Sequence, residues 1–277
     1  MKRKSILLTG CSSGIGYDAA HGLKSRGWEV FATCRRESDV NKLRSEGFYS
    51  FVLDYTNEAS MDEAIQSVLN VTQGRLNALF NNGAFACPGA VEDLPTDALR
   101  SVFETNFFGY HYLTKKIIAV MRQQGYGRII NCSSVLGMVA MPWRGSYVAS
   151  KFALEGLTHT LRIEMKDTPI RVILIQPGPI KSKIRENSLR HFEKWIDWKS
   201  SPRAAQYQNR LLVRLYENKN RDYFELPPSA VTRKLIKALE ATNPNPCYFV
   251  TIPTYTMNFL RRLLPTRWLD YLIEKSL

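Results

Sequence analysis

The sequence predicts an α/β fold, a Rossmann-type doubly wound parallel sheet in a single domain. Short apolar runs alternate with longer segments whose apolar residues recur every three or four positions, and a glycine-rich turn follows the first apolar run. The 277 residues suit one large domain, and a content of 44% apolar and 23% charged residues is ordinary for a globular protein. We therefore expect one domain over residues 1–277.

Six short apolar runs are predicted to be buried parallel strands. They span residues 6–9, 30–33, 51–53, 78–80, 129–132 and 172–175. The intervening segments have helical spacing and are predicted to cover the sheet; they span residues 15–25, 58–72, 96–121 and 147–166. Right-handed crossovers between such strands produce a doubly wound sheet.

The pattern loosens after Pro177. Residues 179–208, which we call the lid segment, are polar with scattered aromatic residues and are predicted to be a surface excursion or a substrate lid. A helix near residues 229–240 and a last strand at 248–251 follow. In the C-terminal extension, residues 252–277, an amphipathic helix over 257–273 is expected to break at Pro265; it packs on the core or a partner, or weakly contacts a membrane surface.

Composition argues against several classes of protein. Five cysteines without a CxxC pair favour a reducing compartment such as the cytoplasm, and four histidines without ligand spacing predict no metal. The first apolar run is too short for a signal peptide, and no window reaches the roughly 18 apolar residues of a spanning helix. The net charge of +13 is spread along the chain, so we interpret it as a basic surface that attracts an anionic cofactor and expect no nucleic acid.

A glycine-rich turn lies between the first predicted strand and the first predicted helix. Residues 9–16 read Thr-Gly-Cys-Ser-Ser-Gly-Ile-Gly, which lets backbone N–H groups approach a pyrophosphate at the positive end of the helix. A glycine turn alone is a weak signal, but this position favours a dinucleotide site. The candidate contacts are Gly10, Ser12, Ser13, Gly14, Ile15 and Gly16.

The residues after the second predicted strand favour NADP(H) over NAD(H). An acidic residue there would bind the 2′-hydroxyl of NAD, whereas this chain has Arg35 and Arg36, whose guanidinium groups would pair with a 2′-phosphate. Two solvated arginines are the alternative reading. A loop shift that brings Glu37 or Asp39 to the ribose would restore NAD binding.

Tyr147 and Lys151 are spaced to lie one turn apart on one helix face. A free phenol with a pKa of about 10 is a poor base, and a neighbouring ammonium favours the phenolate. Lowering the pKa by about 3 units requires about 4 kcal/mol, which a lysine together with an oxidised nicotinamide could supply in a partly desolvated site. Ser134 ends a predicted strand at the edge where open α/β sheets bind ligands. Its hydroxyl could donate to a substrate carbonyl.

With these motifs in their order, the sequence resembles the classical short-chain dehydrogenase/reductase family over about residues 5–251. The motifs are the glycine turn, Asn81-Asn82-Gly83, Asn106, Ser134, Tyr147, Lys151 and Pro177-Gly178. The glycine turn and Cys34-Arg35 look most like the hydroxysteroid and retinol dehydrogenase-like group. The run Pro-Gly-Pro-Ile and the basic tail look similar to a bacterial NADP-dependent aldehyde reductase.

The resemblance implies a role for each catalytic position. Tyr147 would protonate the substrate oxygen, and Ser134 would orient it. Lys151 would bind the nicotinamide ribose and lower the pKa of the tyrosine, and Asn106 would hold a water of the proton relay.

It also implies cofactor contacts. Asp54 would meet the adenine, Asn82 would support the sheet near the cofactor, and Ser12 with Arg35 would face the 2′-phosphate. The remaining candidate contacts are Gly83, Pro177, Gly178, Ile180 and Ser182. Two positions depart from the family pattern: Gly83 precedes Ala84 where the family has alanine then glycine, and Ser182 replaces a common threonine.

Large apolar side chains are predicted to line the substrate site, which favours a lipophilic aldehyde, retinal-like or steroid-like substrate. They are Phe85, Val135, Leu136, Met141, Trp143, Phe192, Trp195 and Trp198, with packing in the core as the alternative for several. A catalytically silent NADP-binding sensor or scaffold is the rival function. The resemblance also implies a homodimer or homotetramer formed through the helices at 96–121 and 147–166.

Overall fold

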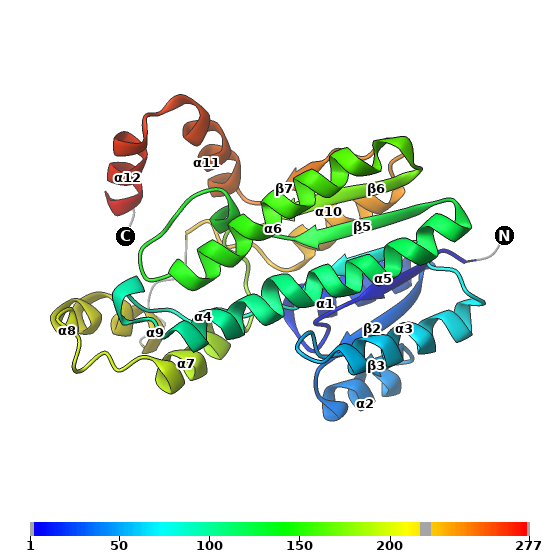
Figure 1. Cartoon of the computed structure of the whole chain (residues 1–277), viewed down its shortest axis with the longest axis horizontal. Coiled ribbons are helices and arrows are strands. Elements are labelled where there is room, and N and C mark those ends of the chain that lie inside the picture. The colour runs from blue at the N-terminus through cyan, green and yellow to red at the C-terminus, as the bar shows by residue number, and fades with distance from the viewer. Residues whose placement is uncertain (1–2, 217–222, 276–277) are drawn as a thin grey trace.

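The computed structural model of the chain describes residues 3–216 and 223–275; residues 1–2 and 276–277 of the predicted domain lie outside it. The strands are β1 (Ser5–Leu8), β2 (Glu29–Cys34), β3 (Tyr49–Val52), β4 (Ala78–Asn81), β5 (Gly127–Cys132), β6 (Ile170–Gln176) and β7 (Cys247–Phe249). In the described chain they form one parallel sheet of order β3-β2-β1-β4-β5-β6-β7, with helices on both faces (Figure 1). The predicted Rossmann-type fold is confirmed.

The helices lie close to the predicted segments. They are α1 (Gly14–Ser25), α2 (Glu37–Ser45), α3 (Glu58–Thr72), α4 (Thr96–Phe103), α5 (Gly109–Gln124), α6 (Gly145–Glu164), α7 (Ile184–Trp195), α8 (Ala204–Gln206), α9 (Val213–Tyr216), α10 (Ser229–Glu240), α11 (Ile252–Leu263) and α12 (Thr266–Lys275). The expected helix at 96–121 is interrupted by a π-helical turn, Glu104–Phe108, between α4 and α5. The helices α2 and α7, which are rich in charged residues, and the short helices α8 and α9 were not predicted.

The two sides of the sheet carry separate apolar cores. Ile6 and Leu8 of β1 pack in the cluster that includes residues of α1, α2 and α10, whereas Leu7 packs in the cluster with residues of α3, α5 and α6. Strands buried on both faces need apolar residues at every position, which explains the continuous apolar runs of the sequence.

The aromatic residues of the lid segment pack mainly with one another. Phe192 is buried in a third cluster with Tyr207, and Trp143, Trp195 and Trp198 pack against this cluster. The Tyr207 hydroxyl donates to Asp93 and accepts from a backbone N–H, each over 2.8 Å. Four aromatic residues predicted as possible substrate lining therefore pack in a core instead: Trp143, Phe192, Trp195 and Trp198.

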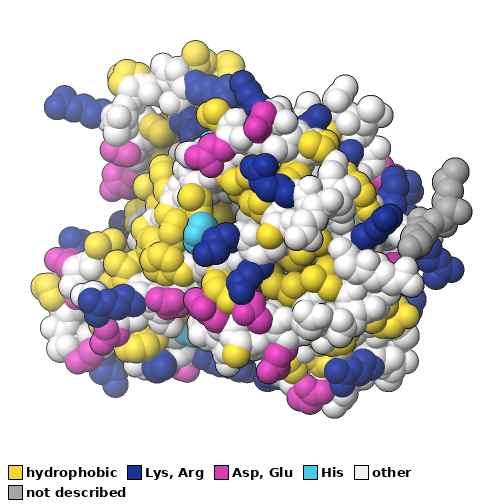
Figure 2. All heavy atoms as spheres, turned by 45° about the vertical axis from the view of Figure 1, so that its right-hand side comes forward, with side chains coloured by type: hydrophobic (Ala, Val, Ile, Leu, Met, Phe, Trp, Pro, Cys, Tyr) yellow, Lys and Arg dark blue, Asp and Glu magenta, His cyan; other side chains and the backbone are white. Residues whose placement is uncertain are grey.

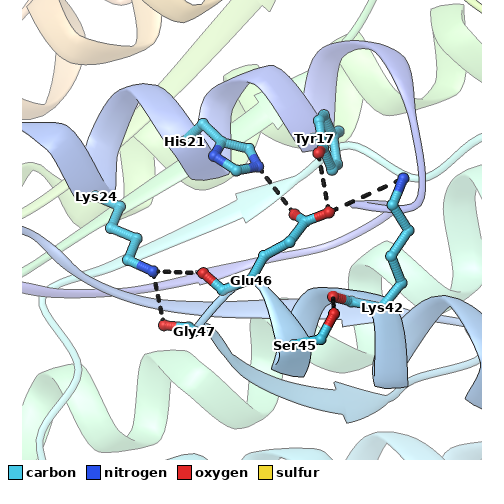
Figure 3. A network of polar contacts seen from close by, with 7 residues as sticks. All are labelled: Tyr17, His21, Lys24, Lys42, Ser45, Glu46 and Gly47. Carbon is cyan, nitrogen blue, oxygen red and sulfur yellow. Dashed lines mark hydrogen bonds and ion pairs between the residues drawn. The ribbon is translucent and has the colours of Figure 1, made fainter.

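A polar network ties α1 to the end of α2 (Figure 3). The Glu46 carboxylate accepts from Tyr17 and contacts His21, each over 3.1 Å, and Lys42 approaches it to 4.0 Å. Lys24 donates to the Glu46 carbonyl over 2.8 Å. Since α1 begins at the glycine turn, these contacts help to fix that turn relative to the sheet.

The C-terminal extension forms two helices instead of one. The chain breaks at Leu264, which is extended as expected for a residue before proline, so the predicted interruption at Pro265 is confirmed. Figure 1 shows α11 and α12 as a hook beside the carboxyl end of the sheet. In the described chain, no helix is long and apolar enough to cross a membrane.

Candidate active site

A cavity of about 920 Å³ lies at the carboxyl ends of the strands, bounded by the glycine turn and by α7. Most of the predicted site residues line it. These are Gly10, Ser12, Ser13, Gly14, Ile15, Arg35, Arg36, Asp54, Asn82, Gly83, Ser134, Tyr147, Lys151, Pro177, Gly178, Ile180 and Ser182. Two further predicted site residues, Gly16 and Asn106, do not line the cavity. This is the crevice where the strand order reverses, the place at which such sheets bind ligands.

The glycines of the turn allow close backbone approaches. Gly10 has a left-handed φ of 67°, and a Cβ there would lie 2.6 Å from the Cα of Gly83. A Cβ on Gly16 would overlap the carbonyl oxygen of Gly10. Gly14, with φ of 57°, opens α1 and faces Ser182. The turn therefore brings the N-terminus of α1 to the cavity without side chains in the way, which fits a dinucleotide pyrophosphate.

Asn82 holds the glycine turn from the neighbouring strand end. Its side-chain amide donates to the carbonyl oxygens of Thr9 and Gly10 over 3.1 and 3.4 Å, and its backbone N–H donates to the Thr9 hydroxyl over 2.8 Å. These contacts tie the carboxyl ends of β1 and β4 together, and a role of Asn82 at a bound cofactor stays a prediction.

The departure at Gly83 and Ala84 causes little distortion. A Cβ on Gly83 would meet Tyr55 at 3.3 Å and Gly10 at 3.4 Å, so the family's alanine would require a shift of only tenths of an ångström. Ala84 has no left-handed φ among the described residues and needs no glycine. The exchanged order of glycine and alanine therefore does not strain the backbone of this turn.

Arg35 and Arg36 line the cavity directly after the carboxyl end of β2. Both are exposed, and Arg36 donates to Asp39 over 2.9 Å. No hydrogen bond joins Arg35 to any other described residue, so its guanidinium group is available to an anion. Asp54 is turned toward its own loop, where its carboxylate accepts twice from Thr56, each over 2.9 Å.

Ser134 and Tyr147 meet at the opposite end of the cavity. Ser134 follows β5, and its hydroxyl oxygen accepts from the N–H of Leu136 over 3.1 Å. Tyr147 lies in the first turn of α6, and the nearby Ser134 hydroxyl acts to lower the pKa of its phenol. The serine oxygen accepts a hydrogen bond from this backbone N–H. The hydroxyl still has its own proton, which it can donate to a substrate oxygen.

The loop before α6 is held in a strained conformation. Trp143 has a left-handed φ of 64°, which is rare for a bulky residue and costs about 1–3 kcal/mol. Its carbonyl accepts from Gly89 over 3.1 Å, and its ring lies 4.9 Å from that of Tyr207. These contacts offset the strain and fix the start of α6 at Gly145, two residues before Tyr147.

Lys151 lies one turn beyond Tyr147 and points into the same cavity. Its side chain is 1% exposed, its Nζ donates to the carbonyl of Cys132 over 2.8 Å, and it lies 5.6 Å from the centre of the Tyr147 ring. Burial lowers the pKa of Lys151 to about 8, although Cys132 and Glu155 act in the opposite direction. The expected pairing of the two side chains is present.

In the protein alone the pKa of Tyr147 is raised; the expected lowering included an oxidised nicotinamide beside Lys151 and stays a prediction. Burial raises the pKa of Tyr147, an ionised Cys132 would raise it further, and the hydrogen bond from Ser134 lowers it less. Tyr147 therefore carries its proton at neutral pH and is ready to donate it.

The Asn106 side chain holds the loop after β4. It lies in the π-helical turn, is fully buried, and bonds both the N–H and the carbonyl of Phe85, over 3.1 and 2.9 Å. A further hydrogen bond of 3.2 Å reaches Ser150 on α6. The Asn106 amide thus fixes the Phe85 backbone relative to α6. A role in holding a water of the proton relay stays a prediction.

A buried chain of hydrogen bonds behind the site was not predicted. The Tyr55 hydroxyl contacts Thr9 over 2.7 Å and donates to Asn81 over 3.0 Å. Asn81 donates to Asn131 over 2.9 Å, and Asn131 donates to Thr158 on α6 over 3.0 Å. The available signal was two asparagines at the ends of otherwise apolar strands, since buried amides require partners.

The substrate end of the cavity is partly apolar and partly basic. Of the predicted apolar lining, Phe85 and Leu136 face the cavity, and Phe85 is stacked on His191 of α7 with 4.0 Å between ring centres. Ile184, Leu189 and Leu215, not singled out from the sequence, join them. The lid segment also contributes basic side chains to the lining: Lys181, Lys183, Arg185 and Arg190.

Metal chemistry has no structural support in the described chain. No group of three or more His, Cys, Asp or Glu side chains among residues 3–216 and 223–275 could hold a metal ion. The five cysteines are free thiols, and Cys132 is buried next to Lys151.

Comparison with known proteins agrees with this geometry. The model of the short chain dehydrogenase family matches residues 4–192. An uncharacterized oxidoreductase of Escherichia coli, YbbO, is 35% identical over 272 residues, covering 98% of this chain and 94% of its own length. An NADPH-dependent 3-dehydrocapnine reductase of Ornithobacterium rhinotracheale is 30% identical over 284 residues, covering 98% and 96%.

Solved structures show the same fold. The crystal structure of a short-chain dehydrogenase from Streptomyces avermitilis is similar with a TM-score of 0.78 at 24% identity, over 98% of this chain and 97% of that one. This chain belongs to the short-chain dehydrogenase family, a family of oxidoreductases.

Proposed function

We propose that the protein is an NADP(H)-dependent oxidoreductase that transfers a hydride between the nicotinamide and a carbonyl or alcohol carbon of a lipophilic substrate. The observation that carries the proposal is the grouping of Ser134, Tyr147 and Lys151 at one end of a cavity whose other end holds the glycine turn and Arg35. A catalytically silent scaffold would not need a proton donor, a hydrogen-bond donor and a cation, here Tyr147, Ser134 and Lys151, grouped in one place.

The chain's own residues supply the proton and the orientation. Bound NADPH supplies the hydride. Ser134 donates a hydrogen bond to the substrate oxygen, and Tyr147 donates its hydroxyl proton to that oxygen as negative charge develops there. Lys151, held by the Cys132 carbonyl, places a positive charge near the tyrosinate that remains. In the protein alone Tyr147 carries its proton at neutral pH, as a proton donor in carbonyl reduction must.

The preference for NADP(H) is tested at Arg35. Because a charge-assisted hydrogen bond is worth about 1.5–3 kcal/mol, we expect Arg35→Ala to weaken NADPH binding by about tenfold or more and to leave NADH binding nearly unchanged. Titration of the cofactor followed by tryptophan or NADPH fluorescence measures both. Arg44→Ala, which removes an exposed arginine of α2 paired with Glu37, is the matched control. Equal affinities of the unaltered protein for both cofactors would reject the proposal.

The lipophilic substrate is tested with a homologous series. If the apolar end of the cavity holds the chain of the substrate, each buried CH₂ contributes about 0.8 kcal/mol, so kcat/KM for straight-chain aldehydes should rise about fourfold per added carbon until the cavity is filled. The measurement is NADPH absorbance during turnover. A flat series, or turnover of small polar aldehydes alone, would contradict the lipophilic assignment.

The remaining parts of the proposal concern assembly and surroundings. We propose a homodimer or homotetramer through α5 and α6, supported by the exposed side chains of Phe108, Phe152 and Ile163 on this part of the surface. We propose that the enzyme works in the cytoplasm, without nucleic acid as a partner, and that its C-terminal helices touch a membrane surface weakly.

A further inference from the structure

The C-terminal helices direct large apolar side chains to solvent. Of the described residues, α11 buries only Thr254 and α12 only Ile273. Seven large apolar side chains on the two helices are exposed, with exposed fractions from 39% to 64%. These side chains, which we call the C-terminal patch, are Ile252, Tyr255, Phe259, Leu263, Trp268, Tyr271 and Leu272.

The patch follows helical spacing on both helices. Tyr255, Phe259 and Leu263 recur every four residues along α11, and Trp268 and Tyr271 are three residues apart on α12. Exposed apolar residues scattered singly are ordinary, but a grouped set on two consecutive amphipathic helices marks an interaction site.

Basic side chains accompany the patch. Arg261 and Arg262 lie in the last turn of α11, and Arg267 lies near the start of α12; all three are exposed. In Figure 2, Lys or Arg side chains stand beside hydrophobic ones on the projecting part at the top of the view. Aromatic and aliphatic residues on one face with arginines beside them are typical of helices that lie in the interface of an anionic membrane.

Charge favours a lipid surface over a second copy of the chain. Two copies joined patch to patch would bring their arginines together, and each copy carries a net charge of +13. An anionic leaflet instead attracts each arginine near its surface.

We propose that α11 and α12 dock the protein on the surface of an anionic phospholipid membrane, with the C-terminal patch inserted at the headgroup level. The helices that carry the C-terminal patch lie next to the substrate end of the cavity. α11 contacts the turn Val135–Gly137, whose Leu136 lines the cavity, and Thr251 and Thr254 at its start pack against Gly178. A lipid-dissolved substrate would thus enter close to the bilayer; this second part rests on the proposed function.

The experiment measures binding of the full chain to sedimented vesicles. Vesicles of equal parts phosphatidylglycerol and phosphatidylcholine should bind the protein at 0.1 M salt, and vesicles of phosphatidylcholine alone should bind it at least tenfold more weakly. Phe259→Ser with Trp268→Ser should weaken binding to the anionic vesicles at least tenfold. The matched control, Tyr49→Ser with Val91→Ser, removes two exposed apolar side chains elsewhere and should bind like the unaltered protein.

A second variant tests the charges without touching the apolar face. Since each basic residue near an anionic leaflet strengthens binding about fivefold, Arg261→Gln with Arg262→Gln should weaken binding about 25-fold, and 0.5 M salt should have a similar effect. This pair also serves if the serine variants fold poorly.

Three results would overturn the docking proposal. They are no binding of the unaltered protein to anionic vesicles, equal binding by the arginine variant, and a lower oligomer mass of the serine variant in place of a loss of vesicle binding. The last result would make the patch an interface between copies. Turnover of a water-soluble aldehyde without vesicles is measured on every variant; it should be unchanged, so a failure of docking is distinct from a failure of the proposed activity.

Discussion

Tyr147→Phe is expected to lower kcat for carbonyl reduction by about 10²–10⁴-fold, because the ring remains but the proton donor is lost. The phenol meets Ser134 at the cavity and carries its proton at neutral pH. Since the glycine turn and Arg35 are untouched, the Kd for NADPH should change less than twofold. Steady-state turnover and a cofactor titration on the same preparation measure both quantities.

Tyr110→Phe is the matched control for this experiment. The Tyr110 ring also lies near Lys151, 5.3 Å from its Nζ, but its hydroxyl is buried and has no hydrogen-bond partner among the described residues. Removing that hydroxyl should leave kcat nearly unchanged. If Tyr147→Phe retained most of the turnover, or if both variants lost it equally, Tyr147 would not be the proton donor.

Gly16→Ala is expected to weaken NADPH binding by at least tenfold and to destabilise the fold by about 1–3 kcal/mol. The added Cβ would overlap the Gly10 carbonyl and lie 2.9 Å from the Asn82 amide, so the glycine turn must move away from the N-terminus of α1. Urea unfolding measures the stability, and cofactor titration measures the binding.

Gly83→Ala provides the comparison on the opposite side of the same turn. Its Cβ would meet neighbours at 3.3 Å or more, so we expect a cost below about 1 kcal/mol and cofactor binding within about threefold of the unaltered protein. Equal losses in Gly16→Ala and Gly83→Ala would show that the close approach of Gly16 to Gly10 does not control the site.

The sheet could be predicted from the sequence because its strands are buried on both faces. β1 contains the apolar run at 6–8 and β6 the run at 172–175, and the glycine turn marks the point where β1 passes into α1. The helical period revealed α3, α5 and α6, each with one apolar face on the sheet. These signals are local, so they are visible in the chain itself.

Other features depend on contacts between distant segments. Nothing local shows that Trp143 and Trp198 gather around Tyr207 instead of lining the substrate site. Likewise, the spacing of Tyr147 and Lys151 predicted their proximity, but the direction of the tyrosine pKa depends on burial by the whole cavity wall. The role of Asn106 also follows from the position of Phe85, 21 residues away in the chain.

The hydrogen-bonded row from Tyr55 through Asn81 and Asn131 to Thr158 also checks how the sheet is assembled. Asn81 of β4 lies opposite Asn131 of β5 in the parallel register. A slip of one residue between these strands would turn the amides to opposite faces and leave them without partners in the interior, at a cost of about 1–3 kcal/mol each. Misaligned pairings of β4 and β5 are therefore disfavoured as the chain folds. The register in turn fixes where the two strands end relative to each other at the crevice.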